Sequence, residues 1–178
     1  MDIADLVKQA KKGNKEALLT LIMSEKDAYY RLALTYMHNP NDAMDALEDM
    51  IVKLYENINQ LKQDSSFYSW SKTVLVNHCK NLLRKKNKVV LIDDWDDSLE
   101  LNSNSNFIDN SYTSIENQMD IKKMLSYLNN DQREAIKLKY FHDLDYQLIA
   151  DLTNVPIGTV KSRIFQGLKK LKEQFGGA

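Results

Sequence analysis

The sequence is poor in helix-breaking residues and in cysteine. Its 178 residues include five glycines, two prolines and one cysteine, Cys79. One cysteine excludes an internal disulfide, and no nearby residue forms a thiolate-activating pair with it, so Cys79 is predicted to lie in the core. The chain also lacks an apolar run long enough for a signal peptide or a membrane span. This absence predicts a cytoplasmic protein without membrane insertion.

The dominant pattern in the sequence is helical. Apolar residues recur mostly at intervals of three and four, and no segment has a convincing strand pattern. With 43% apolar and 28% charged residues, the composition is that of a globular protein. We therefore predict an all-α fold, in a chain long enough for one ordinary domain or two small ones.

The charge is strongly segregated, although its formal sum is only −1. Residues 71–88 contain six bases and no acid, residues 89–120 contain eight acids and no base, and residues 153–178 contain five bases and one acid. The acidic stretch includes a polar, low-complexity run that buries too little apolar surface to fold. The pattern predicts two small helical domains, residues 1–88 and 115–178, joined by a flexible acidic linker at 89–114.

The first basic block lies on a helix predicted to begin at Phe67, after a cap at Ser65 or Ser66. Its predicted buried stripe is formed by Leu75, Cys79 and Leu82. The opposite side carries Trp70, Thr73, Asn77, Lys80, Asn81, Arg84 and Lys88. This mixture suits single-stranded nucleic acid, because cations attract phosphates, a flat ring stacks on bases and amides bond base edges. The alternative is that Trp70 packs inside the domain and the amides are only solvated.

An earlier helix is predicted to follow the break at residues 39–41, with Asp42 as its N-cap. Its apolar face is formed by Ala43, Ala46, Leu47, Met50, Leu54 and Ile58. The charged residues Asp45, Glu48, Asp49 and Lys53 fall elsewhere on the helix. Taken alone, they are most simply interpreted as a solvated surface.

The C-terminal part has a helix-turn-helix pattern. Asp131 and Glu134 have the spacing of a capping box and open a helix that ends near Phe141. A short helix at about 146–152 is followed by a turn in which Asn154 tolerates a positive φ. The core stripe of the last helix is predicted to be Val160, Ile164, Leu168 and Leu171, with Gly167 beside it.

The outward face of this last helix combines hydrogen-bonding groups, cations and one apolar ring. Its residues are Thr159, Lys161, Ser162, Arg163, Phe165, Gln166, Lys169 and Lys170. Such side chains reach base edges and phosphates in a major groove, and free amides at the helix start donate hydrogen bonds to a phosphate. Periodicity alone equally allows a solvated amphipathic helix, but the preceding helix and turn favour DNA binding.

Two parts of the chain resemble one family, the group 4 or extracytoplasmic-function (ECF) sigma factors of the sigma-70 family. Residues 128–141, beginning LNNDQREA, and residues 155–163, VPIGTVKSR, resemble region 4 of that family. Residues 42–55 and 66–84 resemble region 2. The two matches are collinear with the family, and together they identify the chain better than a helix-turn-helix alone.

The resemblance implies a sigma factor that binds core RNA polymerase and promoter DNA. Region 2 of the family binds the clamp helices of the largest polymerase subunit and melts the −10 element, while region 4 reads the −35 element and meets the flap. The implied polymerase contacts are Asp42, Asp45, Glu48, Asp49 and Lys53. The implied −10 contacts are Asp64, Ser65, Ser66, Phe67, Trp70, Asn77, Lys80, Asn81 and Arg84. The −35 contacts are the outward face of the last helix.

No catalytic residue, cofactor or metal site is expected. The sequence has no Gly-rich phosphate loop, metal-ligand spacing or nucleophile-base arrangement, and His38, His78 and His142 are scattered. An anti-sigma factor is compatible with a two-domain chain as a further partner. The rival interpretation is a stand-alone helix-turn-helix regulator that binds duplex DNA without polymerase, which leaves Trp70 and the first basic face without a role.

Overall fold

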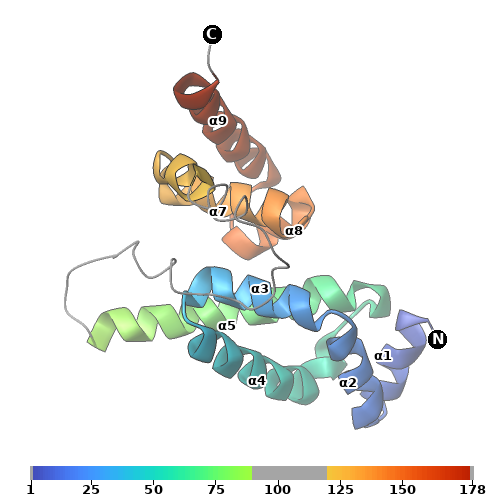
Figure 1. The fold of residues 1–178 in the computed structure, drawn as a ribbon. Coiled ribbons are helices and arrows are strands. Elements are labelled where there is room, and N and C mark those ends of the chain that lie inside the picture. The colour runs from blue at the N-terminus through green and yellow to red at the C-terminus, as the bar shows by residue number, and fades with distance from the viewer. Residues whose placement is uncertain (1, 90–119, 177–178) are drawn as a thin grey trace, which may run out of the picture. The chain divides into compact units, whose positions relative to one another are not determined.

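The computed structural model describes residues 2–89 and 120–176, apart from the side chains of residues 88 and 89. Within these ranges every regular element is a helix (Figure 1), so the predicted all-α fold is confirmed. The chain divides into two compact units, residues 1–104 and 105–178, and each is described by itself. The predicted acidic linker, 89–114, lies outside the described residues except for residue 89, which ends a helix.

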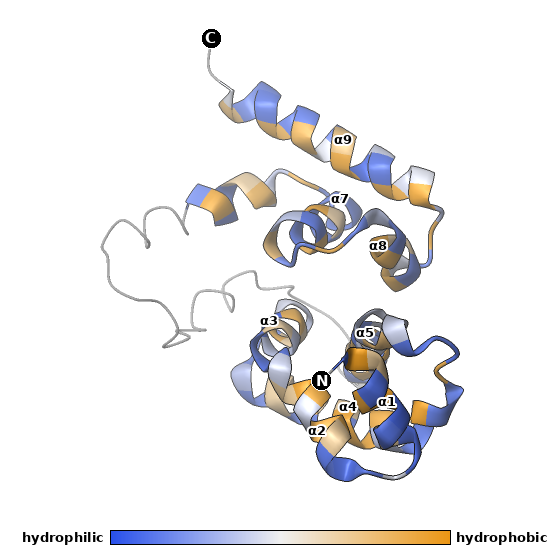
Figure 2. Cartoon of the chain, turned by 90° about the vertical axis from the view of Figure 1, so that its right-hand side faces the viewer, coloured by the Kyte–Doolittle hydropathy of each residue, from blue (hydrophilic) through white to orange (hydrophobic). Residues whose placement is uncertain are grey.

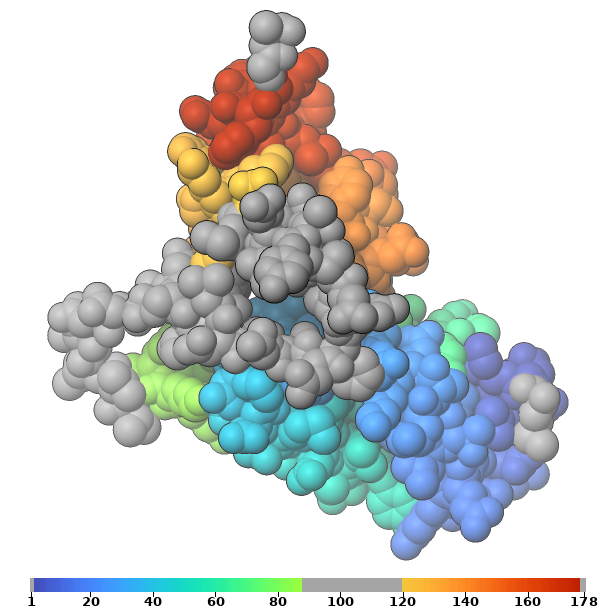
Figure 3. Space-filling model, in the orientation of Figure 1, coloured from blue at the N-terminus to red at the C-terminus, as the bar shows by residue number. Residues whose placement is uncertain are grey.

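The N-terminal unit consists of helices joined by short turns. Within residues 2–89 these elements are α1 (Ile3–Lys11), α2 (Lys15–Ser24), α3 (Lys26–Met37), α4 (Pro40–Asn57), the 3-10 turns η1 (Ile58–Gln60) and η2 (Asp64–Ser66), and α5 (Phe67–Val89). The helix α3 packs against both α4 and α5, and α1 packs against α2. In the space-filling view of Figure 3, the side chains of α2, α3 and α4 form a continuous surface.

The start of α4 differs from the predicted one. The N-cap is Asn39, whose side chain accepts hydrogen bonds from the amides of Asn41 and Asp42 at 2.9 and 3.1 Å. Pro40 occupies the first turn, where a missing N–H costs nothing. The prediction of Asp42 as the cap is therefore wrong, and the helix begins at Pro40. In α5, the predicted start at Phe67 is confirmed, and Ser65 and Ser66 belong to η2.

The core of this unit lies between α3, α4 and α5. Tyr29, Phe67 and Leu75 are fully buried, as is Cys79, whose core position is confirmed. Burial raises the pKa of the Cys79 thiol to about 12. The hydroxyl of Tyr29 lies 2.7 Å from the hydroxyl of the buried Ser71, and this bond satisfies two polar groups inside the core. Burial raises the pKa of Tyr29 as well.

The C-terminal unit begins, in the described part, with helical residues 120–126. It continues with α7 (Asn130–Ile136), a π-helical stretch η4 (Lys137–Phe141), α8 (Tyr146–Thr153) and α9 (Ile157–Phe175). The predicted end near Phe141 is confirmed. The predicted capping box is wrong, because Asn129 caps α7: it accepts from the Gln132 amide at 2.8 Å, and the Gln132 side chain accepts from the Asn129 amide at 3.3 Å.

The turn between α8 and α9 depends on Asn154. It adopts the left-handed conformation, with φ 55° and ψ 43°, as predicted. Asp145 caps α8 by accepting a bond from the Leu148 amide at 2.7 Å. These two ends set the direction in which the chain enters α9.

The inner side of α9 differs from the predicted stripe at two positions, Leu168 and Leu171, of which Leu171 is half-buried. Val160, Ile164 and Gly167 are buried, whereas Leu168 is 41% exposed. Gly167 lies where α9 packs against α7. The two helices approach so closely there that a Cβ at position 167 would lie 2.5 Å from Cδ1 of Ile136. Figure 2 shows hydrophobic residues along one side of α9 and hydrophilic residues along the other. The close approach fixes which side of α9 faces solvent.

Candidate nucleic-acid interface

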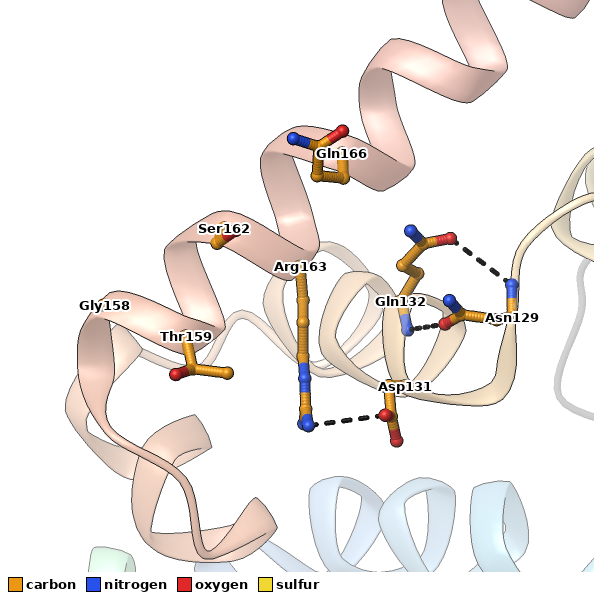
Figure 4. A pocket seen from close by; sticks show the side chains of 8 residues that line it. All are labelled: Asn129, Asp131, Gln132, Gly158, Thr159, Ser162, Arg163 and Gln166. Carbon is orange, nitrogen blue, oxygen red and sulfur yellow. Dashed lines mark hydrogen bonds and ion pairs between the residues drawn. The ribbon is translucent and has the colours of Figure 1, made fainter.

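A hollow of about 420 Å³ lies beside the N-terminal half of α9 (Figure 4). It is lined by Asn129, Asp131, Gln132, Gly158, Thr159, Ser162, Arg163 and Gln166. The oxygens of Asn129 and Gln132 are already engaged in the cap of α7. The groups contributed by α9 therefore supply most of the chemistry that this hollow offers to a ligand.

The predicted outward face of α9 is exposed. Lys161, Ser162, Gln166, Lys169 and Lys170 are exposed, and Thr159 is half-buried. Phe165 is 66% exposed, more than any other large apolar side chain among the described residues. An apolar ring held in solvent between polar and cationic neighbours has no packing role in the free protein, and it fits contact with a thymine methyl.

Arg163 lies at the edge of this face and is engaged. Its Nη2 is 3.3 Å from Oδ2 of Asp131 in the first turn of α7, and its side chain is 23% exposed. Figure 4 shows the Arg163 side chain running from α9 toward Asp131. Arg163 therefore differs from the other predicted −35 residues, because it joins two helices of the unit.

The outer side of α5 carries the predicted mixture of groups. Asn77, Asn81 and Arg84 are exposed, while Lys80 is half-buried with its ammonium 5.6 Å from the centroid of the Tyr36 ring. Arg84 donates a hydrogen bond to the side-chain oxygen of Asn81. These residues form a continuous polar and cationic strip along the second half of the helix.

Trp70 lies in the first turn of α5, about two turns before that strip. Its ring is half-buried and tilted against Phe67, with 6.2 Å between the ring centroids. Both interpretations of Trp70 are therefore partly met, since the ring packs on one side and remains accessible on the other. Lys72 does not join the strip, because its ammonium lies 2.8 Å from a carboxylate oxygen of Glu25.

The segment before α5 has two predicted base contacts that are already occupied. Phe67 is fully buried, so in this conformation it is a core residue and presents no surface to a base. Asp64 accepts a bond from the Lys11 ammonium at 2.6 Å. Ser65 is exposed, and the Ser66 hydroxyl donates to the side-chain oxygen of Gln63 at 3.4 Å. Neither Lys11 nor Gln63 is among the residues that the sequence pattern predicts.

The acidic side of α4 is partly tied to α5. The Lys86 ammonium lies 2.6 Å from a carboxylate oxygen of Asp42, and Nε2 of His78 lies 2.8 Å from one of Asp49. Asp45 and Glu48 are exposed, and Lys53 is half-buried. Of the residues predicted for polymerase binding, Asp42 and Asp49 are therefore paired with side chains of α5.

Among the described residues, no group of three His, Cys, Asp or Glu side chains could hold a metal ion. No helix in the described ranges is long and apolar enough to cross a membrane.

Known proteins resemble the chain in both units. Residues 21–89 match the family model "Sigma-70 region 2", and residues 118–171 match "Sigma-70, region 4". The RNA polymerase sigma factor SigV of Bacillus subtilis is 29% identical over 92% of this chain and 94% of its own length. The ECF RNA polymerase sigma factor SigW of the same organism is 28% identical over 98% of this chain and 97% of its own.

A solved structure extends the likeness to the fold. The sigma factor RpoE of Bartonella quintana, crystallised with the anti-sigma factor NepR, is 25% identical, covers 86% of this chain and 93% of its own, and superposes with a TM-score of 0.64. Both regions thus occur in the family order, and relatives match almost the whole chain. The chain belongs to the sigma-70 family as an ECF sigma factor, a non-catalytic protein that binds core RNA polymerase and promoter DNA and directs promoter-specific transcription initiation.

Proposed function

We propose that this sigma factor reads the −35 element as duplex with the exposed face of α9 and holds the opened −10 strand with the outer strip of α5. The observation that carries the proposal is the exposed Phe165 ring, set on a helix whose opposite side is locked against α7 by Gly167. A rigid helix with an apolar ring on its solvent side is suited to a major groove.

Within the α9 face, we assign different tasks to different side chains. Ser162 and Gln166 line the hollow and are exposed, so they reach base edges. Phe165 meets a thymine methyl. We assign the phosphates to the Thr159 hydroxyl near the start of α9 and to the cations Lys161, Lys169 and Lys170, because contacts to phosphates position the duplex without reading its sequence. Arg163 contributes through its bridge to Asp131.

On the N-terminal unit, we assign the opened −10 strand to the α5 strip. Asn77 and Asn81 supply amides for base edges, Lys80 and Arg84 attract phosphates, and the accessible side of Trp70 stacks on a base. The segment 64–66 directly precedes α5, and we assign to it the edge of a pocket for one unpaired base of the −10 strand, with Phe67 buried in the core next to it.

We assign polymerase binding to the outer side of α4, where Asp45 and Glu48 are exposed acids. Asp42 and Asp49 share the surface but also hold α5 through Lys86 and His78, and Lys53 borders it. The clamp helices of the largest subunit are the proposed partner here, and the flap is the proposed partner of the C-terminal unit. The working domains are proposed as 1–88 and 115–178, with 89–114 as the acidic linker.

An anti-sigma factor is a further proposed partner, because the similar Bartonella quintana protein was crystallised with one. We place the protein in the cytoplasm, where a bacterial polymerase transcribes.

The division of work is tested with two DNA substrates and reconstituted holoenzyme, on promoters that the holoenzyme selects from a random library. Phe165→Ala and Gln166→Ala should weaken binding of −35 duplex and leave binding of a −10 fork with an exposed strand unchanged. Asn77→Ala and Asn81→Ala should do the reverse. The assignment fails if either pair of variants weakens both substrates equally.

A further inference from the structure

The helix α1 contacts a loop that lies about fifty residues further along the chain. α1 precedes the residues that match the region 2 family model, which begin at residue 21. Nevertheless, α1 packs against both η1 and η2, the two turns between α4 and α5. This places the last turn of α1 beside the segment that carries the proposed −10 base pocket.

Lys11 makes the polar part of this contact. Its ammonium donates to the backbone oxygen of Leu61 at 2.8 Å and to a carboxylate oxygen of Asp64 at 2.6 Å. Both charged side chains are largely covered, with 25% of Lys11 and 22% of Asp64 exposed. Reduced contact with water strengthens such a pair relative to an exposed one, and bonds between charged partners are shorter and stronger than neutral ones.

The loop is anchored in the core at both ends. Ile58 and Leu61 are buried before it, and Phe67 is fully buried after it. Between these anchors, residues 62 and 63 and residue 65 are exposed. A short exposed loop that must hold one shape needs a restraint of its own, and Lys11 supplies one by joining a backbone oxygen near the beginning of the loop to a side chain near its end.

We propose that Lys11 is a positioning residue for −10 recognition, and that it fixes the shape in which residues 62–66 receive an unpaired base. In this arrangement Asp64 is the anchor of the loop. The groups presented to the base are then the exposed side chains of Gln63 and Ser65, with the Gln63 amide oriented by the Ser66 hydroxyl. The proposal rests on the proposed assignment of the opened −10 strand to this unit.

A merely structural role for Lys11 makes a different prediction. Val7 and Ala10 are buried on the inner side of α1, so apolar packing holds the helix in place without Lys11. If Lys11 only added stability, its loss would lower the binding of polymerase, −35 duplex and −10 strand together. A positioning role would change the base preference at one unpaired position and leave the other two activities intact.

The test uses the full chain assembled with core polymerase. Lys11→Met removes the charge and keeps a long unbranched side chain. Lys11→Arg keeps the charge and can donate two hydrogen bonds. Lys8→Met is the matched control because Lys8 is exposed on the same helix. Amide hydrogen exchange of residues 62–66 reports the loop directly in the free protein. Binding to fork DNA with each of the four bases at an unpaired −10 position reports the base preference.

For Lys11→Met we expect exchange in residues 62–66 to rise and base preference to fall, each by about tenfold, the factor that a lost hydrogen bond to a charged group implies. Binding of core polymerase and of −35 duplex should stay at the level of Lys8→Met, and Lys11→Arg should restore the preference. If Lys11→Met does not fold, Asp64→Asn, which leaves the bond to Leu61, should show the same two changes.

Faster exchange with an unchanged base preference would overturn the proposal, as would a uniform loss of all three binding activities. In both cases a wild-type holoenzyme that still prefers one base on the fork would leave the proposed function intact. Absence of any base preference in the wild-type holoenzyme would contradict the assignment of the −10 strand itself, and the role of Lys11 with it.

Discussion

Arg163 of α9 lies 3.3 Å from Asp131 of α7, so the helix proposed to read DNA is joined to its neighbour by an ion pair beside the hollow. Asp131 is 64% exposed and Arg163 only 23% exposed. The Arg163 side chain therefore lies against the protein surface, while the Asp131 side chain is largely in solvent. This geometry indicates that Arg163 orients α9.

The first prediction concerns this pair. We expect Asp131→Asn and Arg163→Met each to weaken −35 duplex binding by the holoenzyme by about two- to fivefold, with the double variant no weaker than either, because an exposed ion pair contributes about 0.2–1 kcal/mol. The measurement is a double-mutant cycle of affinities at fixed salt. Tighter binding by Asp131→Asn together with looser binding by Arg163→Met would instead mean that Asp131 withholds a DNA-contacting arginine.

The second prediction concerns Gly167. Alanine is a better helix former by about 1 kcal/mol, but its Cβ would lie 2.5 Å from Cδ1 of the buried Ile136, and overpacking costs about 1–3 kcal/mol. We expect Gly167→Ala to destabilise the C-terminal unit by about 1 kcal/mol in urea unfolding.

The matched control for this prediction removes the clashing atom. Ile136→Val lacks Cδ1, so Gly167→Ala made in the Ile136→Val background should be neutral or stabilising. Equal destabilisation in both backgrounds would show that the cost does not come from this contact.

The third prediction concerns Cys79. Because burial raises the pKa of its thiol to about 12, the native protein should react very slowly with iodoacetamide at pH 8, and unfolded protein should react rapidly. A folded-state pKa above the ordinary value of 9.0 also gives stability that is present below pH 9 and is lost as the pH rises toward 12. Cys79→Ala should reduce the slope of stability against pH in that window. Rapid native alkylation would contradict the buried position.

The fourth prediction separates the two roles of Trp70. Trp70→Ala should weaken binding of a −10 fork by about tenfold or more, because one stacked base contributes about 1–3 kcal/mol. It should also lower stability, since the ring packs on Phe67. Trp70→Phe should keep most of the stability and part of the affinity. Unchanged fork binding by both variants, at retained stability, would leave Trp70 a packing residue only.

Helical periodicity in the sequence predicts the positions of most helices and the exposed face of α9, because these depend on neighbours three and four residues apart. The caps are harder to predict. Asn39 and Asp42, or Asn129 and Asp131, are equally good acceptors, and only the backbone shows which one precedes the first helical residue. Sequence position likewise does not reveal that α7 approaches α9 at Gly167.

The contacts of the −10 segment could not be predicted from local sequence at all. Lys11 and Asp64 are 53 positions apart, and no local pattern distinguishes this lysine from the exposed Lys8. A helical projection gives the direction of Phe67 but not the helices that cover it. Long-range packing decides both the Lys11–Asp64 contact and the burial of Phe67.

We propose that this chain directs core polymerase to promoters by using both units together. The most direct measurement is run-off transcription by purified core polymerase on library-selected promoters, with and without this protein. We predict transcripts that depend on the protein, start at a fixed distance from a shared pair of −35 and −10 elements, and disappear when either element is replaced. Stable binding of −35 duplex by the free protein, without association with core polymerase or any dependent transcript, would instead identify a stand-alone DNA-binding regulator.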